Sequence, residues 1–311
     1  MSENGVAILG VFVADLAFRA GKLPAIGETI AGSGFAIGPG GKGSNQAVAA
    51  ARAGANVTFI SRIGSDTFGE LALKTWKADG IVPRVTQSAT APTGAAFIYV
   101  HETRGDNAII VVPGAATDIS PSDLDAAAEA IRASRVFVTQ LEQPLDAAHR
   151  GLEIARSAGV ITVFNPAPAR KIDDALYALC DYVVPNESEA EALTGIAVSD
   201  LEAARRAGDA LLAKGVGTAL ITLGERGGLF HTRDHSVPIP PFAAGKVVET
   251  TGAGDAFVGG FAAALARGVE PLEAARFGSA TAGISVTRPG TAPSMPQRAE
   301  IEALLKDQSR S

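Results

Sequence analysis

A regular alternation of short apolar runs with longer amphipathic stretches constrains the fold of this chain more than any other feature. The apolar runs have the length of buried strands and lie at residues 6–9, 57–60, 136–139, 160–164, 182–184 and 219–223. The amphipathic stretches have helical spacing and lie at residues 45–53, 68–79, 122–133, 145–158, 201–214, 255–267 and 272–284. This alternation predicts one α/β domain over residues 1–311, with a doubly wound, mostly parallel sheet flanked by helices.

Two stretches interrupt the alternation, at residues 29–38 and 94–112. In the second stretch, apolar runs at 97–100 and 108–112 flank a polar tip at 101–107, which is typical of a β-hairpin. We expect these segments to form a small, discontinuous β-sheet lid within about residues 11–40 and 94–113. The alternative is that they add edge strands to the main sheet.

Composition narrows the class of partner. The chain is 47% apolar, which is enough to fill a core, and its net charge of −6 would repel nucleic acid phosphates. The single cysteine, Cys180, excludes an internal disulfide and indicates a reducing compartment. No basic leader and no apolar run of about 18 residues are present, so neither export nor membrane insertion is expected. We expect a cytoplasmic protein that acts on a small molecule.

Residues 249–257 are the most informative segment, with the sequence ETTGAGDAF before an apolar helical stretch. A glycine-rich turn that leads into a helix leaves backbone N–H groups free at the positive end of the helix dipole, where a phosphate can bind. Asp255 would lie in the first turn, beside that phosphate, and could accept a proton from an attacking hydroxyl. The alternative is that Asp255 only caps the helix and the glycines only form a turn.

Two other phosphate-binding motifs are excluded. The segment around Lys42 has no hydroxyl residue after the lysine, so it is not a Walker A loop. Gly10, after the first predicted strand, is followed by Val11 and Phe12 and not by a G-x-G-x-x-G pattern, which argues against a dehydrogenase.

Two segments resemble the paired signatures of the ribokinase-like carbohydrate kinases: residues 40–47, GGKGSNQA, and residues 250–257, TTGAGDAF. The resemblance covers nearly the whole chain and includes residues 140–144, 165–170, 185–189 and 222–227. It implies an ATP-dependent kinase that phosphorylates the 5-hydroxyl of a pentose, with D-ribose as the expected substrate. The alternatives are a kinase for 2-deoxyribose, a nucleoside or another sugar, and a non-catalytic sugar-binding protein.

The resemblance also implies site residues. The sugar pocket would be lined by Asp15, Gly41, Lys42, Asn45 and Glu142. Asp255 would be the general base, and the transferring phosphoryl group would lie on Gly252, Ala253 and Gly254. The nucleotide would contact Gly254, Asn186, Ser279 and the loop Thr222, Leu223, Gly224, Glu225, Arg226 and Gly227. Mg²⁺ would be held indirectly by Glu189. K⁺ would be bound by Glu249, Thr251, Ser285, Arg288, Gly290 and Ser294.

Three residues depart from the pattern of the family. Val13 stands where an asparagine that contacts a sugar hydroxyl is usual, and valine offers no hydrogen bond. Our hypothesis is that the pocket tolerates or prefers a pentose without that hydroxyl, such as 2-deoxyribose; the alternative is that a neighbour or a water replaces the asparagine. Glu249 stands where aspartate is usual, and Val258 where asparagine is frequent.

Apolar lid residues such as Phe97 and Tyr99 are expected to be exposed and to pair two lids in a homodimer.

Overall fold

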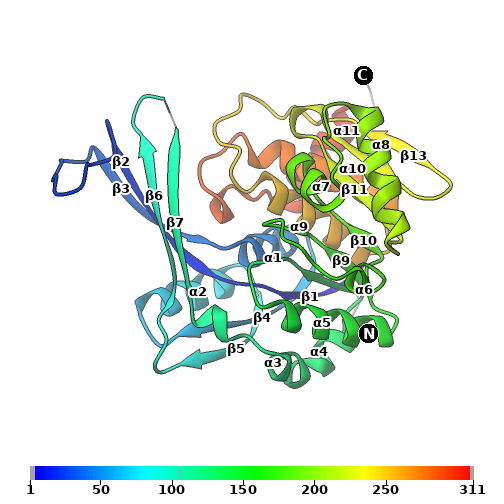
Figure 1. The fold of residues 1–311 in the computed structure, drawn as a ribbon, viewed down its shortest axis with the longest axis horizontal. Helices are drawn as coiled ribbons and strands as arrows, with labels where there is room; N and C mark the ends of the chain where they lie inside the picture. The colour runs from blue at the N-terminus through cyan, green and yellow to red at the C-terminus, as the bar shows by residue number, and fades with distance from the viewer. Residues whose placement is uncertain (1–3, 105, 309–311) are drawn as a thin grey trace.

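A nine-stranded sheet runs through the molecule, in the order β13-β12-β11-β10-β9-β8-β1-β4-β5 (Figure 1). The computed structural model describes residues 4–104 and 106–308. The strands are β1 (Gly5–Leu9), β4 (Asn56–Gly64), β5 (Val82–Ser88), β8 (Val136–Thr139), β9 (Ile161–Phe164), β10 (Tyr182–Val183), β11 (Thr218–Thr222), β12 (Gly228–His231) and β13 (Ser236–Ile239). The strands from β11 to β5 are parallel, and β12 and β13 extend one edge antiparallel. The predicted doubly wound sheet is therefore confirmed.

Helices cover both faces of this sheet, because successive side chains of a strand point to opposite sides. Val6 and Ile8 of β1 belong to one core cluster, and Ala7 and Leu9 belong to the other. The first cluster includes residues of α1 (Lys42–Arg52), α2 (Thr67–Ala78), α9 (Ala253–Ala266), α10 (Pro271–Ser285) and α11 (Arg298–Gln308). The second includes residues of α3 (Pro121–Ala126), α4 (Ala128–Ala133), α5 (Leu145–Ser157), α6 (Asp174–Tyr177), α7 (Glu187–Thr194) and α8 (Leu201–Ala213).

Helices α1 and α9 are in close contact because α9 has a glycine, Gly259, where it faces α1. A Cβ atom placed on Gly259 would lie 2.5 Å from the Cβ of Ala49 and 2.6 Å from the carbonyl oxygen of Gln46. No side chain larger than hydrogen fits at this crossing. The contact brings the first turns of both helices, which carry the two sequence signatures, to one place.

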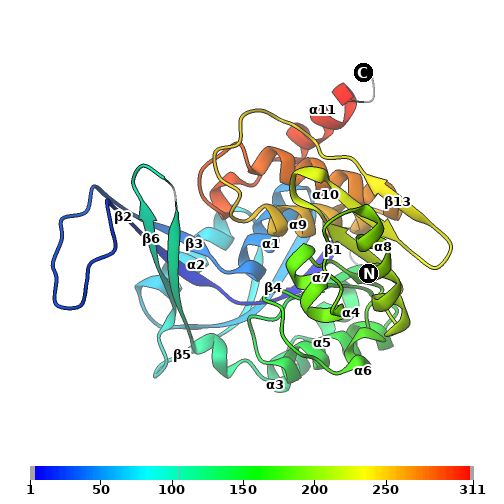
Figure 2. The ribbon, with the colours of Figure 1, turned by 45° about the horizontal axis from the view of Figure 1, so that its top comes forward.

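A separate four-stranded sheet projects from one side of the molecule, as both overall views show (Figures 1 and 2). Its order is β3-β2-β6-β7, from β2 (Val13–Ala20), β3 (Gly34–Gly40), β6 (Thr93–His101) and β7 (Asn107–Gly114). These strands lie within one residue of the predicted segments, and they do not extend the main sheet. The prediction of a hairpin at 29–38 is only half right, because β3 begins at Gly34 and pairs with β2. The predicted polar tip at 101–107 includes Gly105, which lies outside the described residues.

Other differences from the prediction are small. The helix predicted at 122–133 is two helices that meet at Ala127, although the amide of Ala127 still donates to Asp123 O and that of Ile131 to Ala127 O. The pattern missed β5, β12, β13, α6, α7 and α11. Tyr99 was predicted to be exposed, which is wrong: it is buried, and its hydroxyl donates to Ala20 O at 3.4 Å. In the described part of the chain, every helix is too short or too polar to cross a bilayer.

Candidate active site

Asp255 lies in the first turn of α9, which begins immediately after Gly252, a residue in the left-handed conformation with φ of 82°. Its carboxylate is buried and accepts two side-chain amide hydrogen bonds from the first turns of α1. Asn45 Nδ2 donates to Asp255 Oδ2 at 3.0 Å, and Gln46 Nε2 donates to Asp255 Oδ1 at 3.1 Å. Both oxygens are therefore held in a fixed orientation at the amino end of the helix.

Charged side chains surround this carboxylate. The backbone amide of Lys42 donates to Glu142 Oε2 at 2.8 Å, which places the loop after β8 against the start of α1. Burial alone would lower the pKa of Lys42, but the carboxylates around it outweigh that effect and raise the pKa; they belong to Asp255, Glu142 and Glu189. Burial raises the pKa of Glu142 to about 7, against the opposing effect of Lys42. Burial also raises the pKa of Asp255, although Lys42 and the amide donors oppose it.

Asp15 and Val13 reach the same region from β2. A Cβ atom on Gly40, at the end of β3, would lie 2.4 Å from both carboxylate oxygens of Asp15, so the glycine makes room for this carboxylate. Burial, followed by the charges of Glu249 and Asp255, raises the pKa of Asp15 to about 6. Val13 is buried beside Gly94, where a Cβ atom would lie 2.9 Å from its Cγ1. Gly41, with φ of 88°, precedes α1.

A pocket of about 130 Å³ opens at the amino end of α9. It is lined by Lys42, Asn165, Ala167, Val184, Asn186, Glu189, Thr222, Gly252, Gly254, Asp255 and Val258. A Cβ atom on Gly254 would meet nothing within 4 Å, so space is open directly above the first turn of the helix. The open space, the helix amino end and Lys42 together suit an anion. The structure thus brings together the residues expected for base, sugar and phosphate.

The expected nucleotide residues are only partly brought together. Asn186 and Glu189 begin α7 and cap it reciprocally: Asn186 Oδ1 accepts from the Glu189 amide at 2.8 Å, and Glu189 Oε2 accepts from the Asn186 amide at 2.9 Å. Of the loop 222–227, Thr222 lines the pocket; Gly224, Glu225 and Arg226 are exposed beyond it. Gly224 and Gly227 have the positive φ expected of this turn. Ser279 is buried on α10, where its hydroxyl donates to Pro240 O at 3.0 Å.

Metal ligands are sparse among residues 4–104 and 106–308, where no three or more His, Cys, Asp or Glu side chains gather as a metal-binding group. Glu189 fits an indirect contact with Mg²⁺, in which phosphates and waters supply the other oxygens. The residues expected for K⁺ lie on two adjacent segments, because Glu249 Oε2 accepts from the Gly290 amide at 2.8 Å. Ser285 and Ser294 are buried, whereas the side chain of Arg288 points to an ion pair with Glu300.

Sequence reasoning missed three buried amides near the site: Gln46, which donates to Asp255, and Gln140 and Asn165, which are hydrogen-bonded to Gln46. All three lie in segments that carried the family resemblance, but a buried amide has no spacing pattern of its own.

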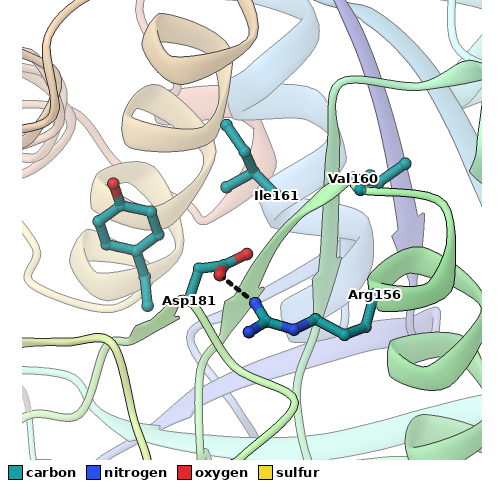
Figure 3. Close-up of a pocket in the computed structure, with 6 residues that line it drawn as sticks. Arg156, Val160, Ile161 and Asp181 are labelled. Carbon is teal, nitrogen blue, oxygen red and sulfur yellow. Dashed lines mark hydrogen bonds and ion pairs between the residues drawn. The ribbon is translucent and has the colours of Figure 1, made fainter.

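A second pocket, of about 400 Å³, lies at the amino ends of β9 and β10, beside the ion pair of Arg156 with Asp181 (Figure 3). The candidate site is at the carboxyl ends of the parallel strands, which is where α/β enzymes bind ligands.

Comparisons with known proteins agree with this geometry. The model of the pfkB family carbohydrate kinases matches residues 4–298. The chain is 40% identical over 302 residues to the ribokinase of Haemophilus influenzae, covering 97% of this chain and 98% of that protein. It is 36% identical over 302 residues to the deoxyribokinase of Salmonella typhi, with coverage of 96% and 98%. The structure of Arabidopsis thaliana ribokinase complexed with ribose and ATP matches with a TM-score of 0.93 at 30% identity, covering 97% of this chain and 99% of that one. The chain therefore has the ribokinase-like fold and belongs to the pfkB family of carbohydrate kinases.

Proposed function

We propose that this chain transfers the γ-phosphoryl group of ATP to the 5-hydroxyl of D-ribose, with Asp255 as the general base. The observation that carries the proposal is a buried carboxylate, held by two amide donors, beside open space above Gly254 at a helix amino end. Relatives named ribokinase, and the Arabidopsis structure complexed with ribose and ATP, support this choice of substrates.

The residues act as follows. Asp255 accepts the proton of the 5-hydroxyl as that oxygen bonds to the γ-phosphorus, and the bond from this phosphorus to the β-phosphate oxygen breaks to release ADP. The ammonium group of Lys42 and the backbone N–H groups of Gly252, Ala253 and Gly254 would stabilise the negative charge that develops on the phosphoryl oxygens. The Ala253 amide donates to Thr250 O at 3.2 Å in this structure, so it would have to exchange that partner for the phosphate. Mg²⁺ would supply further positive charge at the phosphates, held through water by Glu189.

The sugar would be bound by Asp15, Gly41, Lys42, Asn45 and Glu142. Asn45 Oδ1 supports this, because it is buried without a partner among the described residues while Nδ2 of the same amide binds Asp255. A buried acceptor of this kind costs free energy unless a donor such as a sugar hydroxyl reaches it. The pocket therefore favours a polyhydroxylated ligand over an apolar one.

The nucleotide would lie across Asn186, Thr222, Leu223, Gly224, Glu225, Arg226 and Gly227, with Ser279 near the base. A K⁺ ion would order the turn before α9. It would be bound by Glu249 and Thr251 on one segment and by Ser285, Arg288, Gly290 and Ser294 on the other. The bond of Glu249 to the Gly290 amide already joins these two segments, so a cation there would act on a preformed loop pair. A cytoplasmic location fits the use of ATP and the single cysteine.

The small sheet would act as a lid that excludes water from the site. It would be a discontinuous part of the single domain, because two separate segments of the chain form it.

The face of this sheet opposite Asp15 supports pairing of two copies. Side chains alternate along each strand, so this face carries Phe18, Phe35, Ile37, Phe97, Ile110 and Val112, all of them exposed. Large exposed apolar faces are uncommon on monomers, and a homodimer through the lids would cover this one.

A second acceptor, 2-deoxyribose, is favoured by Val13, which lies buried beside the site and cannot donate to a sugar hydroxyl. The deoxyribokinase of Salmonella typhi supports this alternative within the same family. The test is ADP release from ATP and Mg²⁺ with D-ribose and 2-deoxyribose in parallel, with and without K⁺. Turnover on ribose above that on deoxyribose supports the proposal, turnover only on deoxyribose replaces the acceptor, and no turnover on either sugar contradicts both.

A further inference from the structure

We propose that Gln46 is a positioning residue for this reaction. Its side-chain amide fixes the Asp255 carboxylate and connects it to the end of β10, which leads to Asn186 on the proposed nucleotide side of the site. The inference rests on the proposed role of Asp255 as the base. Gln46 is fully buried on α1, one residue after Asn45, and it is not among the proposed catalytic, sugar-binding, nucleotide-binding or metal-binding residues.

The side chain of Gln46 is the centre of a chain of buried amides. Its Nε2 donates to Asp255 Oδ1 at 3.1 Å and to Asn165 Oδ1 at 3.0 Å, and its Oε1 accepts from Gln140 Nε2 at 2.6 Å. Asn165 Nδ2 donates in turn to the carbonyl oxygen of Val184 at 2.8 Å. The chain therefore connects the proposed base on α9 with β10 and the segment that continues to Asn186.

The direction of every bond in this chain follows from its end at Val184. A backbone carbonyl can only accept, so Asn165 must turn its NH₂ group toward Val184 and its oxygen toward Gln46. Gln46 must then present its NH₂ group, whose two hydrogens serve Asn165 and Asp255. The reverse orientation would place the Gln46 carbonyl oxygen against two other oxygens. The amide chain thus ensures that Asp255 receives a donor, which stabilises its ionised, proton-accepting form.

Asp255 can act as a base only while its carboxyl group is ionised. The charged groups around it determine the equilibrium between its ionised and protonated forms. The ammonium group of Lys42 on α1 favours the ionised form. The carboxylates of Asp15 on β2, Glu142 after β8 and Glu189 on α7 oppose it. Loss of the Gln46 donor raises the pKa of Asp255, because a hydrogen bond to the charged form is removed.

The test is the pH profile of kcat/KM for Gln46→Leu, which removes the donor at nearly constant size. We expect the acid limb to move by roughly one pH unit to higher pH, and kcat to fall by about tenfold or more, while KM for ATP changes by less than about threefold. In Gln46→Glu, which keeps the shape, the added carboxyl group should move the acid limb at least as far. An unmoved acid limb in folded enzyme of either variant would overturn the inference.

The matched control is Gln143→Leu. Gln143 is also a buried amide of this region, and it donates to Thr139 Oγ1 and to Gln140 O rather than to Asp255. Its variant should keep the acid limb of the wild type, and an equal shift would mean that loss of any nearby amide has the same effect, which contradicts the inference. If Asp255→Asn keeps full turnover, the proposed base itself is wrong. If Asp255→Asn is inactive while Gln46→Leu keeps the wild-type limb, only the positioning role fails.

Discussion

Asn45 Nδ2 lies 3.0 Å from Asp255 Oδ2, although 210 positions separate the two residues in the chain. This hydrogen bond joins the two glycine-rich signatures of the sequence at one carboxylate. It exists because α1 and α9 cross at Gly259, where no side chain keeps the helices apart. The two signatures, which we propose to bind the sugar and the phosphate, therefore lie side by side in one site.

Replacement of the proposed base tests the mechanism most directly. Asp255→Asn preserves the shape of the side chain but cannot accept the hydroxyl proton, so we expect kcat to fall by about 10² to 10⁴. Binding of ATP, measured by calorimetry, should change little. The exposed Asp118→Asn controls for the loss of one negative charge and should keep wild-type turnover. Turnover of Asp255→Asn close to that of the wild type would contradict the assignment.

The two glycines at the start of α9 should respond differently to alanine. Gly254 has open space around its missing Cβ atom, so Gly254→Ala should leave the melting temperature unchanged or higher, yet it should lower kcat because the methyl group enters the phosphoryl site. Gly252 has φ of 82°, and Gly252→Ala should cost about 1 to 2 kcal/mol of stability. Thermal unfolding and steady-state kinetics check both. Wild-type kinetics in a folded Gly254→Ala would show that no phosphoryl group lies there.

Val13→Asn tests the choice of acceptor. An added hydrogen bond to the hydroxyl that 2-deoxyribose lacks should raise the ratio of kcat/KM for ribose over deoxyribose by roughly fivefold, since such a bond contributes about 1 kcal/mol. Val13→Leu, which changes size but adds no polar group, is the control and should not raise this ratio. If the ratio also stays constant in Val13→Asn, residue 13 does not determine the acceptor.

Stability should depend on pH through Glu142. Its pKa is raised from 4.5 to about 7 in the folded protein, so between these values the folded state holds a proton that the unfolded state has lost. The free energy of unfolding without ligands should fall as pH rises through this range, by up to about 3 kcal/mol, since one pKa unit corresponds to about 1.4 kcal/mol. Asp15 adds a decrease in the same direction, ending at about pH 6.

Denaturant unfolding at several pH values measures this dependence. Glu142→Gln cannot ionise, so its stability should vary less with pH than that of the wild type, whereas the exposed Glu191→Gln on α7 should behave like the wild type. An equally steep decrease in Glu142→Gln would mean that other groups cause it.

The proposed dimer can be tested on a single strand. Ile110 lies on the face of β7 away from Asp15, and Ile109 lies on the opposite face; both are exposed. Ile110→Glu should give a monomeric mass by light scattering, because a charge buried between two apolar faces is costly. Ile109→Glu should keep the dimeric mass. A monomeric wild type would reject the dimer itself.

Much of this architecture could be predicted from the sequence because strand and helix periodicities are local. The runs at 6–9, 57–60, 136–139 and 219–223 each lie within a strand or one residue beyond it. The pattern failed at β5, which lies at one edge of the sheet, and at β12 and β13, which follow β11 as antiparallel strands with no helix between them and so break the alternation of strand and helix. It also misjudged Tyr99, because burial by another element leaves no mark on the residue itself.

For the site, the glycine-rich turn before Asp255 could be inferred from physical chemistry, whereas the sugar pocket came from family resemblance. Gln46 could not be inferred from either. Its importance depends on which atoms its amide meets from Asn165, Gln140 and Asp255, and these are three separate segments that only tertiary packing brings together.

The crossing of α1 and α9 also bears on the order in which the enzyme becomes active during its synthesis. A ribosome completes the segment of Asn45 about 210 residues before it adds Asp255, so a nascent chain contains α1 long before it contains the proposed base. Asn45 and Gln46 reach the proposed base only when α9 packs against α1 at Gly259. We therefore expect a chain that ends before α9 to lack the carboxylate on which the proposed reaction depends.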